Sequence, residues 1–216
     1  MDARIAVLAS GAGSNLQALL DDAAVGSSIV LAVSDNPGAF ALERARARGV
    51  RAVVLEPSHY GTRWDHDVAL EHLLEEEGVE YVLLAGYMRI LGPNVVRAFE
   101  GRVLNVHPAL LPAFPGAHSV RDALEWGVGL TGATVHLVDE HVDHGPIVLQ
   151  EAVAVLDDDD ERSLHARIQE VEHRLFPLAA RLLVEGRLRV DGRHVRVLAE
   201  RPVSAAAGLP SDGASG

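Results

Sequence analysis

Short apolar runs alternate with helix-patterned segments along the first half of this sequence, and few folds accommodate that alternation. The apolar runs have the length of strands and lie at residues 4–9, 29–33, 51–55 and 81–85. Apolar residues at helical spacing fill the stretches between them, at residues 16–20, 39–48 and 63–77. Strands that alternate with helices in this way form a parallel sheet covered on both faces. We therefore predict an α/β domain with a doubly wound, mostly parallel sheet.

The second half of the sequence predicts more elements of both kinds. Strand patterns recur at residues 102–106, 132–138 and 146–149, and a hairpin is expected over residues 188–197. Helix patterns recur at residues 93–99, 119–125 and 162–185, with Ser119 as an expected N-cap. The buried face of the long helix is expected to hold Ile168, Val171, Leu175, Leu178 and Leu182. We expect one domain over residues 1–198, made of halves 1–100 and 101–198, and a flexible tail at 199–216.

Composition excludes several classes of protein. The formal charge of −12 argues against a general nucleic-acid or anionic-membrane surface. The absence of cysteine rules out disulfides, thiolate zinc sites and a cysteine nucleophile. No signal-peptide pattern opens the sequence, and no apolar run reaches the roughly 18 residues of a membrane span. We expect a cytoplasmic protein.

Residues 10–15, Ser-Gly-Ala-Gly-Ser-Asn, follow the first strand and open a helix. This geometry points backbone N–H groups at a phosphate. A tight turn selected for packing is one alternative, and a dinucleotide-binding fingerprint with Asp35 on the ribose is another. The fingerprint fails at its third glycine, which is Leu16 here. We interpret the loop as a monophosphate site to which Ser14 and Asn15 add side-chain hydrogen bonds.

Residues 86–91 keep tyrosine, methionine, isoleucine and leucine where loops are usually polar, which indicates the wall of an apolar pocket. A loop folded under the following helix is an equal alternative. Near the start of the preceding helix, Arg63 has the position of a solvated charge. The sequence gives no metal-ligand spacing to His59, His66 or His72, and we expect all three at the surface. The acidic run at residues 157–160 is expected only to favour a helix dipole.

Asn105 and His107 lie where the strand at residues 102–106 ends at Pro108. Being two residues apart, they point to the same side of a regular strand. Open α/β sheets bind ligands at this end of their strands. An amide that donates a hydrogen bond and an imidazole that transfers protons at neutral pH therefore form a candidate reacting pair.

The segment around this pair resembles the active-site segment of the folate-dependent formyltransferases. The resemblance rests on residues 105–108, 110–112 and 114–116 and on four further segments, 10–15, 86–91, 132–136 with 142–146, and 170–173. It covers about residues 4–190. The sequence departs from the family pattern at Ala109, Ala113 and Val120, where the family usually has serine, a basic residue and a polar residue.

The resemblance implies a formyltransferase-like Rossmann variant whose second half holds the folate. It implies transfer of a formyl group from 10-formyltetrahydrofolate to the amine of glycinamide ribonucleotide, with these small molecules as partners, without metal, by a monomer or homodimer. The implied catalytic residues are Asn105, His107 and Asp143. The implied folate-binding residues are Arg63, Met88, Arg89, Ile90, Leu91, Asn105 and Val142. The implied ribonucleotide-binding residues are Gly11, Ala12, Gly13, Ser14, Asn15, Gly86, Pro108 and Glu172.

Formyl transfer to an amine passes through a tetrahedral carbon with growing charge on oxygen, and the amine must lose a proton. Asn105 and His107 fit these needs. Taken alone, Asp143 is a turn aspartate. The resemblance implies that its loop folds over the strand end, beside His136, where Asp143 favours the protonated form of His107. We expect no chemical role for His144.

Four alternatives belong to other reactions or classes. A formyltetrahydrofolate hydrolase leads us to expect an added N-terminal regulatory domain. A formyltransferase for aminoacyl-tRNA leads us to expect a basic C-terminal domain, and one for an amino sugar differs in its acceptor. A nucleotide-binding module without catalysis would leave the Asn105 and His107 segment without a purpose.

Overall fold

The computed structural model describes residues 3–199, and a sheet with strand order β3-β2-β1-β4-β5-β6-β7-β9-β8 runs through the whole of this part. The strands are β1 (Ile5–Leu8), β2 (Ile29–Ser34), β3 (Arg51–Val54), β4 (Tyr81–Leu84), β5 (Val103–His107), β6 (Leu130–Leu137), β7 (Ile147–Ala154), β8 (Leu188–Asp191) and β9 (His194–Val197). The first five strands pair in parallel, and β6 and β7 turn the sheet antiparallel. The predicted α/β class and mostly parallel first half are confirmed.

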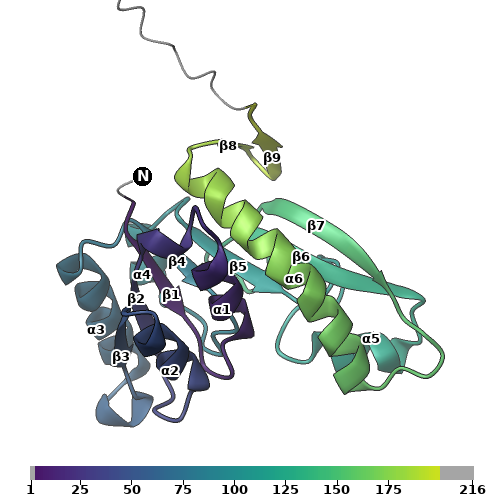
Figure 1. Cartoon of the computed structure of the whole chain (residues 1–216), viewed down its shortest axis with the longest axis horizontal. Coiled ribbons are helices and arrows are strands. Elements are labelled where there is room, and N and C mark those ends of the chain that lie inside the picture. Colours follow the sequence, from purple (N-terminus) through teal and green to yellow (C-terminus); the bar gives the residue numbers. More distant parts are fainter. Residues whose placement is uncertain (1–2, 200–216) are drawn as a thin grey trace, which may run out of the picture.

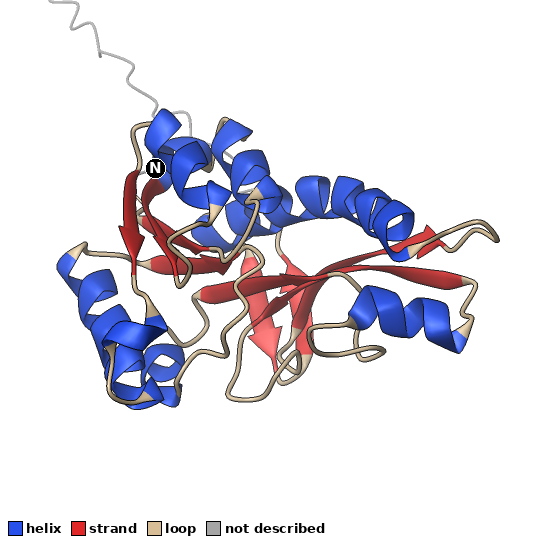
Figure 2. Cartoon of the chain, turned by 90° about the horizontal axis from the view of Figure 1, so that it is seen from below, coloured by secondary structure: helices blue, strands red, loops and turns tan. Residues whose placement is uncertain are grey.

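Helices cover both faces of this sheet, as Figure 2 shows. They are α1 (Ser14–Asp21), α2 (Phe40–Ala47), α3 (Arg63–Glu76), α4 (Pro93–Ala98), α5 (Ser119–Trp126) and α6 (Glu161–Val184), with short 3₁₀ turns η1 (Gly26–Ser28) and η2 (Pro57–His59). In Figure 1 the long helix α6 lies across β6 and β7 and beside α1.

Two hydrophobic cores form because the central strands are buried on both faces. In β1, Ile5 and Val7 pack into the core under α1, α2 and α6, which we call the α6-side core. Ala6 and Leu8 pack into the core under α3 and α4, the α3-side core. This explains why the first strand is a continuous apolar run rather than an alternating one.

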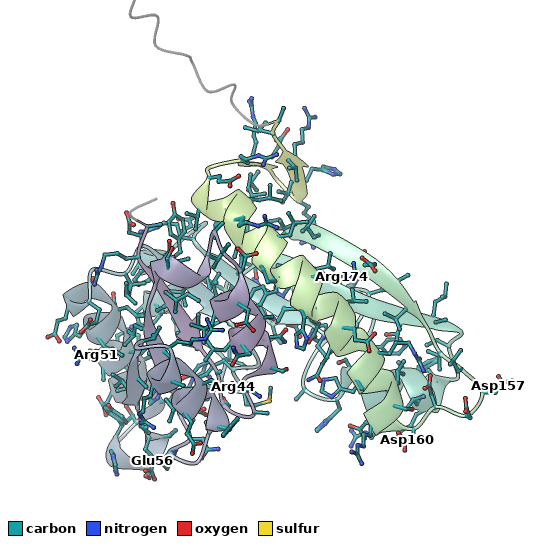
Figure 3. All side chains as sticks on the ribbon, in the orientation of Figure 1. Arg44, Arg51, Glu56, Asp157, Asp160 and Arg174 are labelled. Carbon is teal, nitrogen blue, oxygen red and sulfur yellow. The ribbon has the colours of Figure 1, made fainter. Side chains whose placement is uncertain are left out.

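The start of α6 corrects the expectation that the acidic run only favours the helix dipole. Asp160 is the N-cap and forms a reciprocal capping box with Ser163. Asp159 accepts two hydrogen bonds from Arg167, at 2.7 and 2.8 Å. Figure 3 shows Asp157 and Asp160 at this end of the helix. The run therefore fixes where α6 begins.

Three further expectations were wrong. His66 is buried, with its Nε2 atom 3.0 Å from the Leu55 carbonyl, because the buried face of α3 includes it. Ser119 is the first residue inside α5 and makes no capping bond, since His118 is the N-cap. Leu178 is 38% exposed, and Phe176 and Ala179 take the buried positions on that part of α6.

The last described elements are the predicted hairpin, β8 and β9. It extends the sheet, since β9 pairs in parallel with β7 where His194 meets Ile147. The predicted flexible tail lies almost wholly outside the described residues, which end at residue 199. None of the helices in the described part is long and apolar enough to cross a bilayer.

Candidate active site

A cavity of about 590 Å³ opens where the parallel strands end. Its walls come from the loops after β1, β4 and β5, from the loop between β6 and β7, and from one face of α6. Every residue that the sequence predicted for binding or catalysis lines this cavity except Arg63. The cavity lies at the carboxyl ends of the strands, as expected for an open α/β sheet.

Strand periodicity places Asn105 and His107 together on the cavity wall. Their neighbours Leu104 and Val106 point into the α6-side core, so the alternating residues Asn105 and His107 face the other way. The exposed fraction of His107 is only 5%.

Asp143 joins this pair from the loop between β6 and β7. Its Oδ2 atom lies 3.4 Å from Nδ1 of His107 and accepts a hydrogen bond of 2.7 Å from the backbone N–H of Gly116. Its Oδ1 atom lies 3.4 Å from the side-chain nitrogen of Asn105 and 3.6 Å from Nε2 of His136. Asp143 adopts a φ of 50°, which is uncommon outside glycine. One carboxylate thus contacts both predicted reacting groups.

His136 determines how Asn105 is oriented. Its Nδ1 atom lies 2.8 Å from the Leu137 carbonyl, which only accepts, so Nδ1 carries the hydrogen. In the neutral ring Nε2 then accepts a bond of 3.1 Å from the amide of Asn105. The second amide hydrogen of Asn105 is held only loosely by Asp143, so it is available to an oxygen in the cavity.

His107 can hold one additional proton. Its Nε2 atom lies 2.8 Å from the carbonyl of Phe114, so Nε2 is protonated in both charge states. Nδ1 is the atom that gains or loses a proton, and it faces Asp143. In the charged ring both N–H groups have acceptors.

Burial lowers the pKa of His107 below its ordinary value, although Asp143 and the Phe114 carbonyl partly offset this. The ring is therefore mainly neutral at pH 7, whereas the sequence had led us to expect a protonated one. Burial alone would raise the pKa of Asp143, but the imidazoles of His136 and His107 and the Gly116 amide hold it below its ordinary value. The resting pair is a neutral imidazole beside an ionised carboxylate.

The loop after β5 is held by two polar side chains that the sequence did not reveal. The hydroxyl of Thr134 donates to the Ala109 carbonyl at 2.7 Å and accepts from the Leu111 amide at 3.1 Å. Gln150 donates to the Leu111 carbonyl at 2.9 Å and to Thr134 at 2.8 Å. Both residues lie on strands and look like ordinary polar strand residues in the sequence. They fix the loop that brings the Phe114 carbonyl to His107.

The glycine loop after β1 directs backbone N–H groups into the cavity. The carbonyls of Gly11 and Ala12 point towards α2, where they accept from the Ala41 amide and from Nε of Arg44. In a trans peptide the next N–H points the opposite way, so the amides of residues 12 and 13 face away from α2. Among residues 3–199, no side chain caps α1. These free donors suit an anion.

Gly13 is required by packing rather than by close approach of a ligand. Its φ is 71°, and an added Cβ would lie 2.7 Å from the Cα of Ala41. A Cβ on Gly11 would meet nothing within 4 Å. The loop therefore has room for a ligand at Gly11.

Asn15 and Glu172 form a buried pair at the same end of the cavity. The Asn15 amide donates to Glu172 at 2.8 Å, and its Oδ1 atom has no partner among the described residues. Burial raises the pKa of Glu172. The unpartnered Oδ1 of Asn15 can accept from a hydroxyl or amine, as can Glu172. The second hydrogen of the Asn15 amide can still donate, so its side-chain bond to phosphate stays a prediction.

The loop at residues 86–91 forms the opposite wall. Met88 and Ile90 are 68% and 55% exposed, which leaves apolar surface available to a ligand. Ser10 ties this loop to the glycine loop, because its hydroxyl accepts from the Met88 amide at 2.9 Å and donates to Asp35 at 2.6 Å. Arg63 lies outside the cavity and donates to the Ile90 carbonyl at 2.8 Å. Arg63 therefore supports the loop and does not face a ligand.

Other cavity residues were missed by the sequence reasoning. Those with side chains able to hydrogen-bond include His118, Ser119, His165 and Gln169. The polar residues of α6 at positions 161, 165, 169 and 172 share one helix face, and that spacing was a usable signal. Of the departures from the family pattern, Val120 lines the cavity, whereas Ala109 is fully buried and Ala113 lies outside it.

Comparison with known proteins shows the family to which the chain belongs. The family model for formyl transferase matches residues 3–180. The chain is 48% identical over 193 residues to "Phosphoribosylglycinamide formyltransferase" of Mycobacterium tuberculosis, covering 88% of this chain and 89% of that protein. It is 48% identical over 191 residues to "Trifunctional purine biosynthetic protein adenosine-3" of Drosophila pseudoobscura pseudoobscura, covering 86% of this chain but only 14% of that protein. A solved structure, glycinamide ribonucleotide transformylase 1 from Symbiobacterium toebii, matches with a TM-score of 0.89 and 48% identity, covering 91% of this chain and 94% of that chain.

Proposed function

Because the chain belongs to the formyl transferase family, we propose that it transfers the formyl group of 10-formyltetrahydrofolate to the primary amine of glycinamide ribonucleotide, in purine biosynthesis. The observation that carries this proposal is the cluster of Asn105, His107 and Asp143 inside one cavity. The anion-binding loop lies at one end of that cavity and the apolar loop along another wall.

Each part of the cavity suits one part of the two substrates. The phosphate of the ribonucleotide fits the amides of residues 12 and 13, which face away from α2, and its sugar hydroxyls fit Asn15 and Glu172. The amine then extends towards Asn105 and His107. The folate ring fits between the loop at residues 86–91 and Val142, where apolar surface and backbone groups are exposed.

The reacting groups match the steps of direct amine attack. The amine nitrogen bonds to the formyl carbon, and the oxygen gains negative charge that the free N–H of Asn105 stabilises. The attacking nitrogen loses a proton to the neutral His107, whose charge Asp143 then stabilises. The tetrahedral carbon then collapses, the carbon–nitrogen bond to the folate breaks, and the proton held by His107 passes to the folate nitrogen. Every step uses groups of this chain alone.

The wider setting follows from the same proposal. We place the enzyme in the cytoplasm, with its two small-molecule substrates as partners and without nucleic acid or membrane partners, acting as a monomer or homodimer. The formal charge of −12 supports the exclusion of polyanions. A neutral resting His107 also fits, since a base must be unprotonated before the amine arrives.

The test is tetrahydrofolate release from 10-formyltetrahydrofolate with four acceptors: glycinamide ribonucleotide, aminoacyl-tRNA, an amino sugar nucleotide, and water alone. The proposal predicts release only with glycinamide ribonucleotide, at one formyl group transferred per tetrahydrofolate. Release at the same rate without any amine would instead identify a hydrolase. Tetrahydrofolate release only with another amine would show that glycinamide ribonucleotide is not the acceptor. No release with any acceptor would favour a binding module.

A further inference from the structure

A second cluster of chemically able side chains lies at the rim of the cavity, outside the reacting set. It consists of Asp139, His141 and His144, on the loop between β6 and β7. Nδ1 of His144 lies 2.9 Å from Oδ2 of Asp139, and Nδ1 of His141 lies 3.9 Å from Oδ1. One potential ligand atom from each of the three side chains lies within 4.8 Å of the other two.

The loop itself holds this cluster together. The carboxylate of Asp139 accepts a bond of 2.9 Å from the backbone N–H of His141, which folds the chain into a short turn. The rings of His141 and His144 pack with centroids 5.2 Å apart. Their side chains are 76% and 56% exposed, so both rings can rotate without disturbing a core.

We propose that Asp139, His141 and His144 bind one divalent transition-metal ion of the zinc class. Two imidazoles and one carboxylate are ligands that zinc prefers, whereas magnesium and calcium favour oxygen alone. Tetrahedral zinc with bonds of about 2.0–2.2 Å needs ligand atoms roughly 3.3–3.5 Å apart. The three ligand atoms lie within 4.8 Å of one another, so small rotations of the exposed side chains would bring them to that spacing. The ion would replace the proton that His144 shares with Asp139.

The charges around the cluster affect how tightly it would bind a cation. The Asp139 carboxylate lies 2.9 Å from Nδ1 of His144 and accepts from the His141 amide, and as an acidic side chain it would supply negative charge that attracts a cation. Against this, Arg193 donates to the His144 carbonyl at 2.8 Å, and its guanidinium lies 3.2 Å from Nε2 of the same ring. A positive charge so close weakens cation binding, and removing it should strengthen binding.

The ion would also tie together the segment that carries Asp143. Asp143 lies between His141 and His144 in the sequence, and Asp139 and His141 line the same cavity. Metal binding should therefore slow amide hydrogen exchange across residues 139–145 and leave other loops unchanged. The site was not expected from the sequence, where no metal site was predicted, and the proposed reaction does not use it.

The experiment is calorimetric titration of the full, untagged chain with Zn²⁺ at pH 7.5, with Mg²⁺ as a comparison ion. We expect one zinc per chain and no magnesium. His141→Ala, His144→Ala and Asp139→Asn should each weaken zinc binding about tenfold or more, as loss of a ligand usually does. Arg193→Gln should tighten it. His59→Ala, which removes an exposed histidine beside Glu56, is the matched control and should bind like the wild type.

NMR of the histidine rings in the wild-type protein locates the ion without any variant. Zinc should shift the ring NMR signals of His141 and His144 and leave those of His107 and His136 in place. Zinc binding that survives the double variant His141→Ala/His144→Ala, or that shifts the buried rings instead, would overturn the proposal, as would no zinc binding at all. These readouts do not involve formyl transfer, so the proposed function and the metal site can fail separately.

Discussion

Asp143 is the residue through which the reacting groups act as one unit. It contacts His107, Asn105 and the Gly116 amide from a single carboxylate. His107 could be recognised in the sequence because strand periodicity and a following proline place it. Asp143 could not be placed from spacing, because it depends on a loop that returns from β6, and only the family resemblance indicated it.

Replacing Asp143 by asparagine should lower kcat about 10²- to 10⁴-fold, the usual cost of losing a group that assists proton transfer. The neutral amide no longer stabilises the charged ring, so the pKa of His107 should fall further. In the wild type the acid limb of kcat/KM should lie below pH 6.5, since burial already lowers the pKa of His107 from that value. In Asp143→Asn this limb should move to still lower pH, which an NMR titration of His107 can check.

Two comparisons make this prediction specific. His107→Ala and Asp143→Asn together should cost little more than either alone, because they act as a unit. His144→Ala, measured in metal-free buffer, should keep wild-type kcat, since its ring contacts Asp139 and Arg193 outside the reacting set. A wild-type rate in Asp143→Asn would remove the carboxylate from the mechanism.

At the level of elements, two glycines of the phosphate loop have different roles: Gly11 borders the space for the ligand, and Gly13 packs against α2. Gly11→Val should raise the KM of the ribonucleotide much more than that of the folate, because the new side chain enters the space beside the free amides. Gly13→Val should instead reduce stability by about 2–5 kcal/mol, since overpacking and a strained φ act together. Thermal unfolding and steady-state kinetics of both variants distinguish the two effects. If a folded Gly11→Val protein showed the same rise in KM for both substrates, the loop would have only a structural role.

The apolar loop at residues 86–91 should bind the folate. Ile90→Asp places a charge on a wall that a bound ring would cover, and covering it costs several kcal/mol, or about 10²-fold or more in affinity. Because Ile90 is 55% exposed in the free protein, the variant should fold. Ile90→Val is the matched control and should bind folate nearly as well as the wild type. Fluorescence titration with a folate analogue measures both, and unchanged affinity in Ile90→Asp would exclude this loop from the site.

Thr134 tests the positioning of the loop after β5. Thr134→Val keeps the shape but leaves the Ala109 carbonyl, the Leu111 amide and one donor of Gln150 without their partner. We expect a loss of about 1–3 kcal/mol in stability. Since this loop brings the Phe114 carbonyl to His107, the pKa of His107 should also fall. A destabilised variant with an unchanged His107 titration would limit Thr134 to a structural role.

Across the whole molecule, the architecture followed closely from the sequence because the hydrophobic pattern specifies each strand and helix. The strand order and the antiparallel turn at β6 depend on long-range pairing that local patterns do not encode. Local sequence patterns were equally unable to predict those site residues that depend on long-range contacts. Residues within one segment, such as Asn105 and His107, were grouped correctly, whereas Thr134, Gln150 and the buried His66 depend on contacts between distant segments.

In the proposed reaction, one cavity holds both substrates at once and the amine attacks the formyl group directly. Initial rates with both substrates varied test this most directly, together with a stoichiometric mixture of enzyme and 10-formyltetrahydrofolate. We expect intersecting double-reciprocal lines and no tetrahydrofolate until the ribonucleotide is added. Parallel lines, with one equivalent of tetrahydrofolate released by the enzyme alone, would show a formyl-enzyme intermediate and contradict direct transfer.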